Sequence, residues 1–311
     1  MTLMAQAQAA ADLWGGRVLA LIRNRENAVF RMQMPDGSEA ALRLHRPGYQ
    51  GTASILSELW WCSALADAGL PVPRPIPSRS GDLLDKAGDR PVSALTWLAG
   101  APLGEAGVPL AFSPDEQAAL HSKLGALLAR VHDATDALEL PETFVRPRWD
   151  TEGLCGDAPF WGRYWEHPSL TPPEAKRLAF ARNALQSRLQ RLEKTETLGP
   201  IHADVLRENI LVNKGSLSLI DFDDSGIGFR AYDLGTVLSQ NLYEPSLVNI
   251  REALIAGYQS LRPIDPEVVD LFTLARTLAS VGWTMPRLSP DDPIMRSHIA
   301  RALHCCDLVL G

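Results

Sequence analysis

The chain has few cysteines, no long apolar run and no excess of basic residues, and each absence argues against a class of protein. Its four cysteines contain no C-x-x-C pair, which favours reduced thiols over a disulfide framework (Cys62, Cys155, Cys305 and Cys306). No uninterrupted apolar stretch approaches the roughly 20 residues that a membrane-spanning helix needs. The net charge is −7, and nucleic-acid phosphates require a basic surface, so no nucleic-acid partner is expected.

The start of the chain also lacks the pattern of a targeting segment. Residues 1–7 have neither the basic beginning nor the long apolar core of a signal peptide. No block of Lys and Arg accompanies an amphipathic stretch, so no membrane partner is expected either. We therefore expect a cytoplasmic protein. Its 311 residues, 46% of them apolar, suffice for one two-lobed domain or two small domains.

The most informative segment that is present runs from His202 to Asn209 and has the pattern H-x-D-x-x-x-x-N. Asp221-Phe222-Asp223 follows it, after an apolar stretch. Phosphoryl transfer from ATP needs a carboxylate to orient and deprotonate an acceptor hydroxyl, and oxygen ligands for magnesium. Asp204 is the candidate catalytic base, positioned by His202. Asn209 and Asp221 are the candidate magnesium ligands, with Asp223 as a further one.

The residues between the two motifs predict a β-hairpin. Residues 210–212 and 217–220 are short apolar runs, and a polar turn containing Gly215 joins them. Such a hairpin would place Asn209 at the mouth of its first strand and Asp221 at the exit of its second. Both oxygens would then approach one hard cation from the same end.

These motifs resemble those of the aminoglycoside phosphotransferase, choline kinase and type II homoserine kinase family, a branch of the protein-kinase-like fold. The likeness is greatest to its bacterial homoserine-kinase-type and stress-response-kinase-type members. One departure is that Arg207-Glu208 precede Asn209 where many relatives have Pro-Gly. The resemblance implies an α+β bilobal fold, in which residues 1–98 form a small β-rich nucleotide-binding lobe. Residues 99–311 would form a larger, mainly helical catalytic and substrate-binding lobe.

The first lobe should begin with three strands, at residues 18–22, 28–34 and 40–45, with a turn at 35–38. The phosphate loop of a kinase would lie between the first two strands, but residues 23–27 contain no glycine. By resemblance alone, Asn27 is a candidate for contact with the nucleotide phosphates.

Arg43 occupies the position of the kinase strand lysine. Ala41 and Arg43 are two apart on a strand and so share a face, which would direct both into the cleft, with Arg43 against phosphate. The apolar spacing predicts a helix over 54–67, capped by Ser54 and ended by Gly69, and its Glu58 is expected to brace Arg43. The alternatives are a solvated strand cation and an exposed helix glutamate.

Residues 92–97 should form a strand leading to the join of the lobes. Backbone groups there would meet the adenine edge, which makes Thr96 and Leu98 candidate nucleotide contacts.

The second lobe contains further helical patterns and one irregular stretch. An apolar stripe over 120–131 precedes His132, which is expected to be a buried, hydrogen-bonded histidine. Asp233 is expected to accept backbone N–H bonds, and 266–283 to form another helix. Residues 146–165 are rich in Trp and Arg. They could bind an anionic substrate through arginines, cage an ammonium group with aromatics, or simply pack.

Together these features predict an enzyme that uses ATP and Mg²⁺ to phosphorylate a hydroxyl of a small metabolite, either an amino alcohol or a homoserine-like compound. A rival is a stress-response-type serine/threonine protein kinase. A nucleotide-binding pseudokinase is another, because the glycine loop is missing and Arg43 replaces lysine. An aminoglycoside-resistance enzyme is a third and is less favoured, since such drug-binding sites tend to be strongly acidic and residues 146–165 also carry arginines.

Overall fold

The computed structural model describes residues 2–24, 27–289 and 292–311, and the chain divides into two compact units. The first unit comprises Met1–Ala101 with two later segments, Leu138–Arg146 and Ser218–Asp223. The second comprises Pro102–Ala137, Pro147–Leu217 and Asp224–Gly311. None of the described helices is long and apolar enough to cross a membrane.

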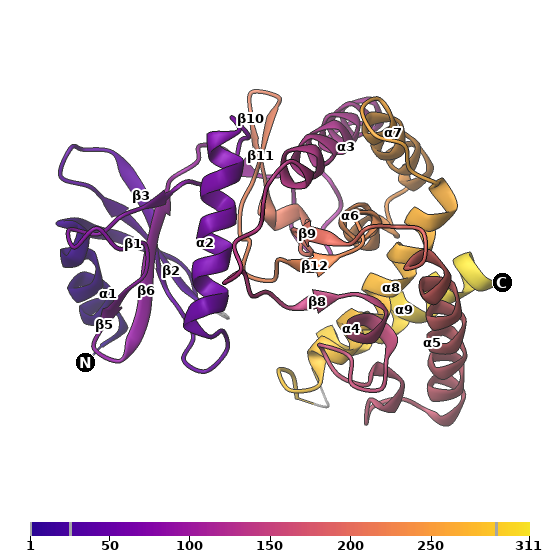
Figure 1. The fold of residues 1–311 in the computed structure, drawn as a ribbon. Helices are drawn as coiled ribbons and strands as arrows, with labels where there is room; N and C mark the ends of the chain where they lie inside the picture. The colour runs from indigo at the N-terminus through magenta and orange to yellow at the C-terminus, as the bar shows by residue number, and fades with distance from the viewer. Residues whose placement is uncertain (1, 25–26, 290–291) are drawn as a thin grey trace. The chain divides into compact units, whose positions relative to one another are not determined.

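An antiparallel sheet forms the body of the first unit (Figure 1). Its strands run in the order β1-β2-β3-β6-β4, with β5 also paired to β6. The predicted strands are confirmed to within two residues at their ends. The strand bounds are β1 Arg17–Asn24, β2 Ala28–Gln33, β3 Glu39–Leu44, β4 Pro75–Ile76, β5 Asp85–Ala87 and β6 Arg90–Thr96.

One face of this sheet packs against α1 (Leu3–Ala11), which continues as a short 3-10 turn at Asp12–Trp14. The buried cluster on that face includes Leu42 and Leu44 of β3 together with Phe30 of β2. Because side chains alternate along a strand, Arg43 lies on the opposite face. Arg43 therefore shares a face with Ala41, as expected, and the contact of that face with a nucleotide stays a prediction.

The helix α2 (Thr52–Asp67) begins two residues earlier than predicted. Its N-cap is Gly51, which offers no side-chain cap, so the prediction that Ser54 caps the helix was wrong. Ser54 lies within the first turn, where its hydroxyl donates a 2.6 Å hydrogen bond to Gln50 Oε1. The predicted end is confirmed: Gly69 follows α2 in the left-handed region with φ 76°, which glycine adopts without steric cost.

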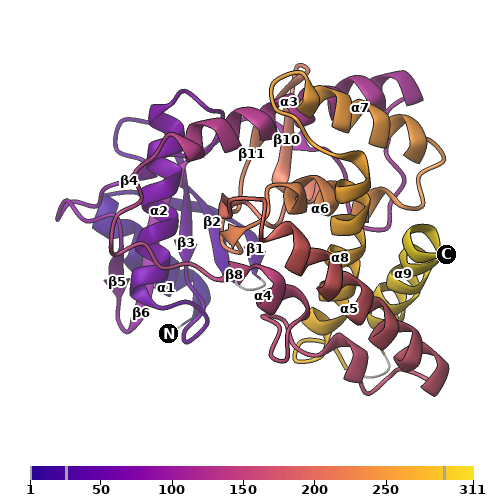
Figure 2. The ribbon, with the colours of Figure 1, turned by 45° about the vertical axis from the view of Figure 1, so that its right-hand side comes forward.

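Helices form most of the second unit (Figure 1). Several start with proline at the first turn, where the missing N–H has no helical partner to lose. Both views show α3 beside α7, and α8 packs between α6 and α9 (Figure 2). The bounds are α3 Pro114–Asp136, α4 Thr151–Cys155, α5 Pro172–Leu192, α6 Ala231–Asn241, α7 Leu247–Gln259, α8 Pro266–Thr284 and α9 Pro293–Leu310, with 3-10 turns at Tyr164–Glu166 and Arg207–Asn209.

The aromatic side chains of residues 146–165 lie mainly in the core of the second unit. Trp149 and Tyr164 are fully buried, and Trp161 is 8% exposed. Packing therefore accounts for these three rings, as one of the three interpretations predicted. The four cysteines are free thiols and all are buried.

The predicted hairpin is confirmed. Strands β10 (Ile210–Asn213) and β11 (Ser216–Leu219) are neighbours in a small sheet with β7 (Ala101–Pro102). The turn residues Lys214 and Gly215 both have positive φ, 49° and 79°, as a two-residue hairpin turn of the mirror-image type requires. A second small sheet has the order β8-β12-β9, with β8 Arg148–Trp149, β9 Gly199–Ile201 and β12 Gly226–Gly228.

Candidate active site

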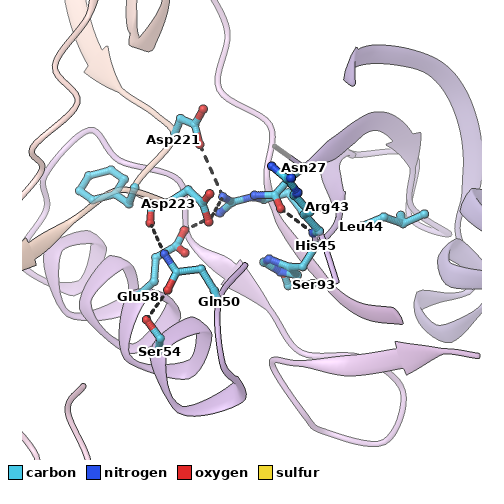
Figure 3. A network of polar contacts seen from close by, with 12 residues as sticks. Asn27, Arg43, Leu44, His45, Gln50, Ser54, Glu58, Ser93, Asp221 and Asp223 are labelled. Atoms are coloured by element: carbon cyan, nitrogen blue, oxygen red, sulfur yellow. Dashed lines mark hydrogen bonds and ion pairs between the residues drawn. The ribbon is translucent and has the colours of Figure 1, made fainter. Parts of the chain in front are cut away.

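Arg43 lies at the centre of a buried ionic network in the first unit (Figure 3). Its Nη1 donates to Glu58 Oε1. Its Nη2 is 3.5 Å from Asp221 Oδ1 and 3.4 Å from Asp223 Oδ1. Arg43 is 5% exposed and Glu58 is 0% exposed. The predicted ion pair between Arg43 and Glu58 is confirmed, and the solvent-exposed alternatives for both residues are excluded.

Electrostatics within this network keep Arg43 charged. Burial acts to lower the pKa of its guanidinium, but Glu58, Asp223 and Asp221 together raise it above its ordinary value. Burial raises the pKa of Asp223 to about 6, against the opposing effect of Arg43. The network therefore gathers three carboxyl groups around one permanent cation.

Arg146 contacts both α2 and the D-F-D segment of the same network. Its Nη2 donates to the backbone carbonyls of Asp223 (2.5 Å) and Phe222 (3.2 Å). Its Nη1 donates to Ser54 Oγ at 3.1 Å and lies 3.9 Å from Glu58 Oε2. Sequence reasoning placed Arg146 among candidate substrate-binding arginines. The structure instead shows a buried side chain that fixes the D-F-D backbone.

Arg23, which was expected in the glycine-free loop, lies in β1 and brings a second cation near Asp221. Arg23 Nη1 lies 3.8 Å from Asp221 Oδ2. Asn27 is 8% exposed, and its Oδ1 accepts a 3.0 Å hydrogen bond from the backbone N–H of Arg46. Arg25 and Glu26, which belong to the same predicted loop, lie outside the described residues.

The candidate adenine contacts lie at the end of β6. Thr96 is its last residue, and the Thr96 backbone N–H and Oγ1 already bond to the backbone O and N–H of Arg74, at 2.8 and 2.9 Å. Leu98 follows two residues later and is half-buried. A nucleotide contact by Asn27, Thr96 or Leu98 stays a prediction.

In the second unit, the H-x-D-x-x-x-x-N spacing brings Asp204 and Asn209 into direct contact. Asn209 Nδ2 donates to Asp204 Oδ2 at 2.8 Å and to its backbone O at 2.9 Å. Asn209 is 2% exposed, and its Oδ1 has no hydrogen-bond partner among the described residues. The Asn209 amide thus holds the Asp204 carboxylate through Nδ2, and its own Oδ1 is left available to accept a bond or bind a cation.

Arg276 of α8 holds the other oxygen of Asp204. Its Nη2 donates to Asp204 Oδ1 at 2.6 Å, and its guanidinium carbon lies 4.7 Å from the centre of the Trp161 ring. Motif reasoning missed Arg276. One signal was present, because Arg276 is the only charged residue between Asp270 and Arg287 of a strongly apolar segment.

Asp233 fixes the backbone of the catalytic loop, as predicted. Its carboxylate accepts hydrogen bonds from the N–H groups of His202 (3.0 Å) and Ala203 (2.7 Å). Burial acts to raise the pKa of Asp233, but hydrogen bonds, led by that of His132, hold it below its ordinary value. The predicted burial of His132 is also confirmed, since it bonds to Asp233 at 3.1 Å and to the Tyr258 hydroxyl at 2.9 Å.

Two residues of the motifs have a left-handed backbone although they are not glycine. Ala203 has φ 63° and Asp221 has φ 66°. Each such conformation costs on the order of 1–3 kcal/mol and persists only where the surroundings enforce it. For Ala203, Asp233 supplies one of these constraints, and His202 Nδ1 adds another by accepting the Asp204 N–H at 3.2 Å.

The chain matches the model of a known family, described as the phosphotransferase enzyme family, over residues 18–272. It belongs to this family. The match includes both active-site motifs together with Arg43, Glu58 and Arg146, and it ends four residues before Arg276.

Three curated relatives share 29–30% of their aligned residues with this chain. The chain is 29% identical to a homoserine kinase of Chelativorans sp. (strain BNC1), over 72% of this chain and 65% of that protein. It is 30% identical to a homoserine kinase of Rhizobium etli (strain CIAT 652), again over 72% and 65%. It therefore spans slightly less than two thirds of these relatives' own length. An uncharacterized protein of Deinococcus radiodurans is 29% identical over 85% of this chain and 76% of its own.

Solved structures of kinases share the fold. A microcompartment-associated aminopropanol kinase is 29% identical, with a TM-score of 0.81 over 99% of this chain and 96% of that chain. A choline/ethanolamine kinase family protein of Mesorhizobium loti, 19% identical, has a TM-score of 0.66 over 99% of this chain and 94% of that chain. The predicted α+β, protein-kinase-like fold class is confirmed, and the protein is a phosphotransferase-family enzyme.

Proposed function

We propose that this enzyme transfers the γ-phosphoryl group of MgATP to a hydroxyl of a small metabolite, an amino alcohol or a homoserine-like compound. Membership of the phosphotransferase family supports the reaction type. Relatives named homoserine kinase and aminopropanol kinase support the acceptor class. The observation that carries most weight is the Asp204–Asn209 pair, a carboxylate held by an amide whose own oxygen is left available.

Asp204 would act as the catalytic base. It would orient the acceptor hydroxyl and accept its proton as the new oxygen–phosphorus bond forms. The bond between the γ-phosphorus and the β,γ-bridging oxygen breaks in the same step, and ADP leaves with that electron pair. His202 would position the loop, a role that its hydrogen bond to the Asp204 N–H supports.

The first unit would supply the nucleotide contacts. Arg43 would bind ATP phosphates, and Glu58 would hold Arg43 in its rotamer through their buried ion pair. Asn27 would contact the phosphates, and backbone groups at Thr96 and Leu98 would meet the adenine. We accordingly assign nucleotide binding to residues 1–98 and catalysis with substrate binding to residues 99–311.

The candidate metal ligands fit a hard divalent cation. Asn209 Oδ1 is a buried acceptor without a described partner, and Asp221 and Asp223 add carboxylate oxygens. In the described ranges no group of three or more His, Cys, Asp or Glu could hold a metal ion. Mg²⁺ is usually bound by one or two carboxylates together with phosphates and water, so these oxygens would hold it alongside the ATP phosphates. When bound, Mg²⁺ neutralises charge on the phosphates.

The test is ADP release from MgATP across amino alcohols, hydroxy amino acids, sugars and aminoglycosides, with Asp204→Asn as the key variant. We expect a compound-dependent rate that falls about 10²- to 10⁴-fold in kcat in the variant, the usual contribution of a general base. The affinity for MgATP should change little. Asp307→Asn is the matched control, since the Asp307 side chain at the end of α9 is 74% exposed and pairs with Arg177 of α5.

Two results would contradict the proposal. Autophosphorylation located by mass spectrometry, without turnover of any compound, would indicate a protein kinase. Binding of MgATP without turnover of any acceptor would indicate a pseudokinase.

A further inference from the structure

Two arginines of the second unit bring positive charge close to Asp204. Arg276 of α8 is 6% exposed, and its Nη2 donates a hydrogen bond to Asp204. Its other terminal nitrogen, Nη1, is buried and has no hydrogen-bond partner among the described residues. The Tyr232 hydroxyl is near the Arg276 guanidinium and acts on its pKa. A buried guanidinium N–H without an acceptor is costly, so Nη1 points to a missing partner.

Arg301 of α9 is the second cation. Its Nη2 donates to His298 Nδ1 at 2.8 Å and to Ser280 Oγ at 3.5 Å. Ser280 is four residues after Arg276 on α8, hence one helical turn away on the same face. The end of the Arg301 side chain is therefore close to Arg276. Its Nε is also buried and has no hydrogen-bond partner in the part of the chain that the structure describes.

Carboxylates do not balance this pair of cations. Arg301 forms no ion pair with any described carboxylate, whereas Arg276 has Asp204 alone at ion-pair distance. Glu208 and Asp224 act on the two arginines only through longer-range attraction. Burial, followed by the charge of Arg276, lowers the pKa of Arg301 to about 10. Burial and both arginines lower the pKa of His298 to about 3, so His298 is neutral at pH 7 and adds no charge.

We propose that Arg276 and Arg301 bind a carboxylate of the phosphate acceptor, which makes the substrate a hydroxylated amino acid or hydroxy acid rather than a plain amino alcohol. This inference rests on the proposed phosphotransferase function and narrows its acceptor class. Guanidinium groups match carboxylates in geometry as well as charge. Since Arg276 also holds Asp204, a carboxylate on its Nη1 would bring the rest of the acceptor next to the base.

The experiment compares acceptors that differ only in the carboxylate. L-Homoserine is paired with 3-aminopropan-1-ol, and L-threonine with 1-aminopropan-2-ol. For the better pair, kcat/KM of the wild type should favour the carboxylated member at least tenfold. In Arg301→Gln, that preference should fall about 10- to 100-fold, the range for a lost hydrogen bond to a charged group. Arg301→Lys, which keeps the charge, should retain part of it.

The matched control is Arg262→Gln, because Arg262 is also in the second unit but pairs with Asp133 and Asp136 of α3. It should leave the preference unchanged. A readout on the wild type alone avoids any folding defect of the variants. L-2-Aminobutyrate, the homoserine analogue without the hydroxyl, should bind in calorimetry and compete with the acceptor, whereas propan-1-amine should not.

The outcomes separate this inference from the function on which it rests. Turnover without preference for the carboxylate, or equal losses for both members of a pair in Arg301→Gln, would overturn the carboxylate site and leave the phosphotransferase standing. Arg301-dependent binding of L-2-aminobutyrate without any turnover would support the carboxylate site while the phosphotransferase proposal failed.

Discussion

At the scale of single residues, the use of arginine at position 43 has a structural reason. A guanidinium offers several N–H groups in one plane and stays charged even when buried. Arg43 uses this to meet Glu58 with one nitrogen and to face Asp221 and Asp223 with another. A lysine would present a single nitrogen to the three carboxyl groups.

The buried pair between Arg43 and Glu58 predicts a large effect on stability. Arg43→Gln would leave Glu58, which is 0% exposed, with only the more distant Arg146 as a cation. Removing one partner of a buried ion pair costs about 3–5 kcal/mol, because the remaining charge is left uncompensated. The measurement is the free energy of unfolding from guanidinium denaturation at pH 7.

The double variant Arg43→Gln/Glu58→Gln provides the control for this prediction. Since it removes the stranded charge as well, it should be more stable than Arg43→Gln alone by at least about 1 kcal/mol. Simple addition of the two single losses would show that the pair has no energetic coupling.

At the scale of elements, α5 and α9 are joined by a carboxylate that also caps a helix. Glu174 completes the capping box of Thr171 at the start of α5, and its carboxylate accepts hydrogen bonds from Arg296 of α9, the shorter at 2.7 Å. The hydrogen bond from Arg296 is the largest cause that lowers the pKa of Glu174 to about 2.

This contact predicts a pH-dependent contribution to stability. A carboxyl whose pKa is lowered on folding stabilises the protein above its ordinary pKa near 4.5 and loses that contribution as the pH falls toward 2. Glu174→Gln should therefore cost about 1 kcal/mol at pH 7, a modest value because Arg296 is 49% exposed on its side chain and solvent screens the pair. The cost should shrink steadily below pH 4.5, as measured by denaturation at a series of pH values.

Glu252→Gln is the comparison for that series, since Glu252 is exposed on α7 and forms no described ion pair. A pH-independent cost of Glu174→Gln would mean that its carboxylate charge contributes nothing to the contact.

Sequence patterns predicted the elements whose ends are set by neighbouring residues. The hairpin was readable because two apolar runs flank a polar turn with Gly215, and the end of α2 because Gly69 follows it. The start of α2 was misplaced because Ser54 is a good capping residue in general, while here it bonds to Gln50 inside the first turn. The helix α1 was not predicted: its alanines carry little periodic contrast, and only packing on the sheet reveals it.

The braces of the site could not be predicted for a different reason. Arg146 meets Asp223, 77 positions later, and Arg276 meets Asp204, 72 positions earlier. No spacing rule connects residues so far apart, so sequence reasoning found the motif residues, suggested another role for Arg146 and did not single out Arg276.

At the scale of the whole molecule, the first unit is assembled from three separate stretches of chain. Arg43 and Glu58 come from the first stretch, whereas Arg146 belongs to Leu138–Arg146, and Asp221 with Asp223 to Ser218–Asp223. The later two stretches supply the buried brace and most of the carboxyl groups around Arg43. A single cut of the chain cannot separate this unit intact.

This assembly predicts that residues 1–101, produced as a fragment, will not fold cooperatively. The fragment would lack Arg146 and Asp223 and would expose Trp61, whose ring packs edge-on against Phe222 with centroids 5.3 Å apart. Small domains have only a few kcal/mol of stability to lose, and these losses together exceed that margin. Circular dichroism and proton–nitrogen NMR spectra should show a broad, non-cooperative thermal transition and poorly dispersed signals. A sharp transition with dispersed signals would mean that the sheet, α1 and α2 are sufficient, and that the later stretches serve the site rather than the fold.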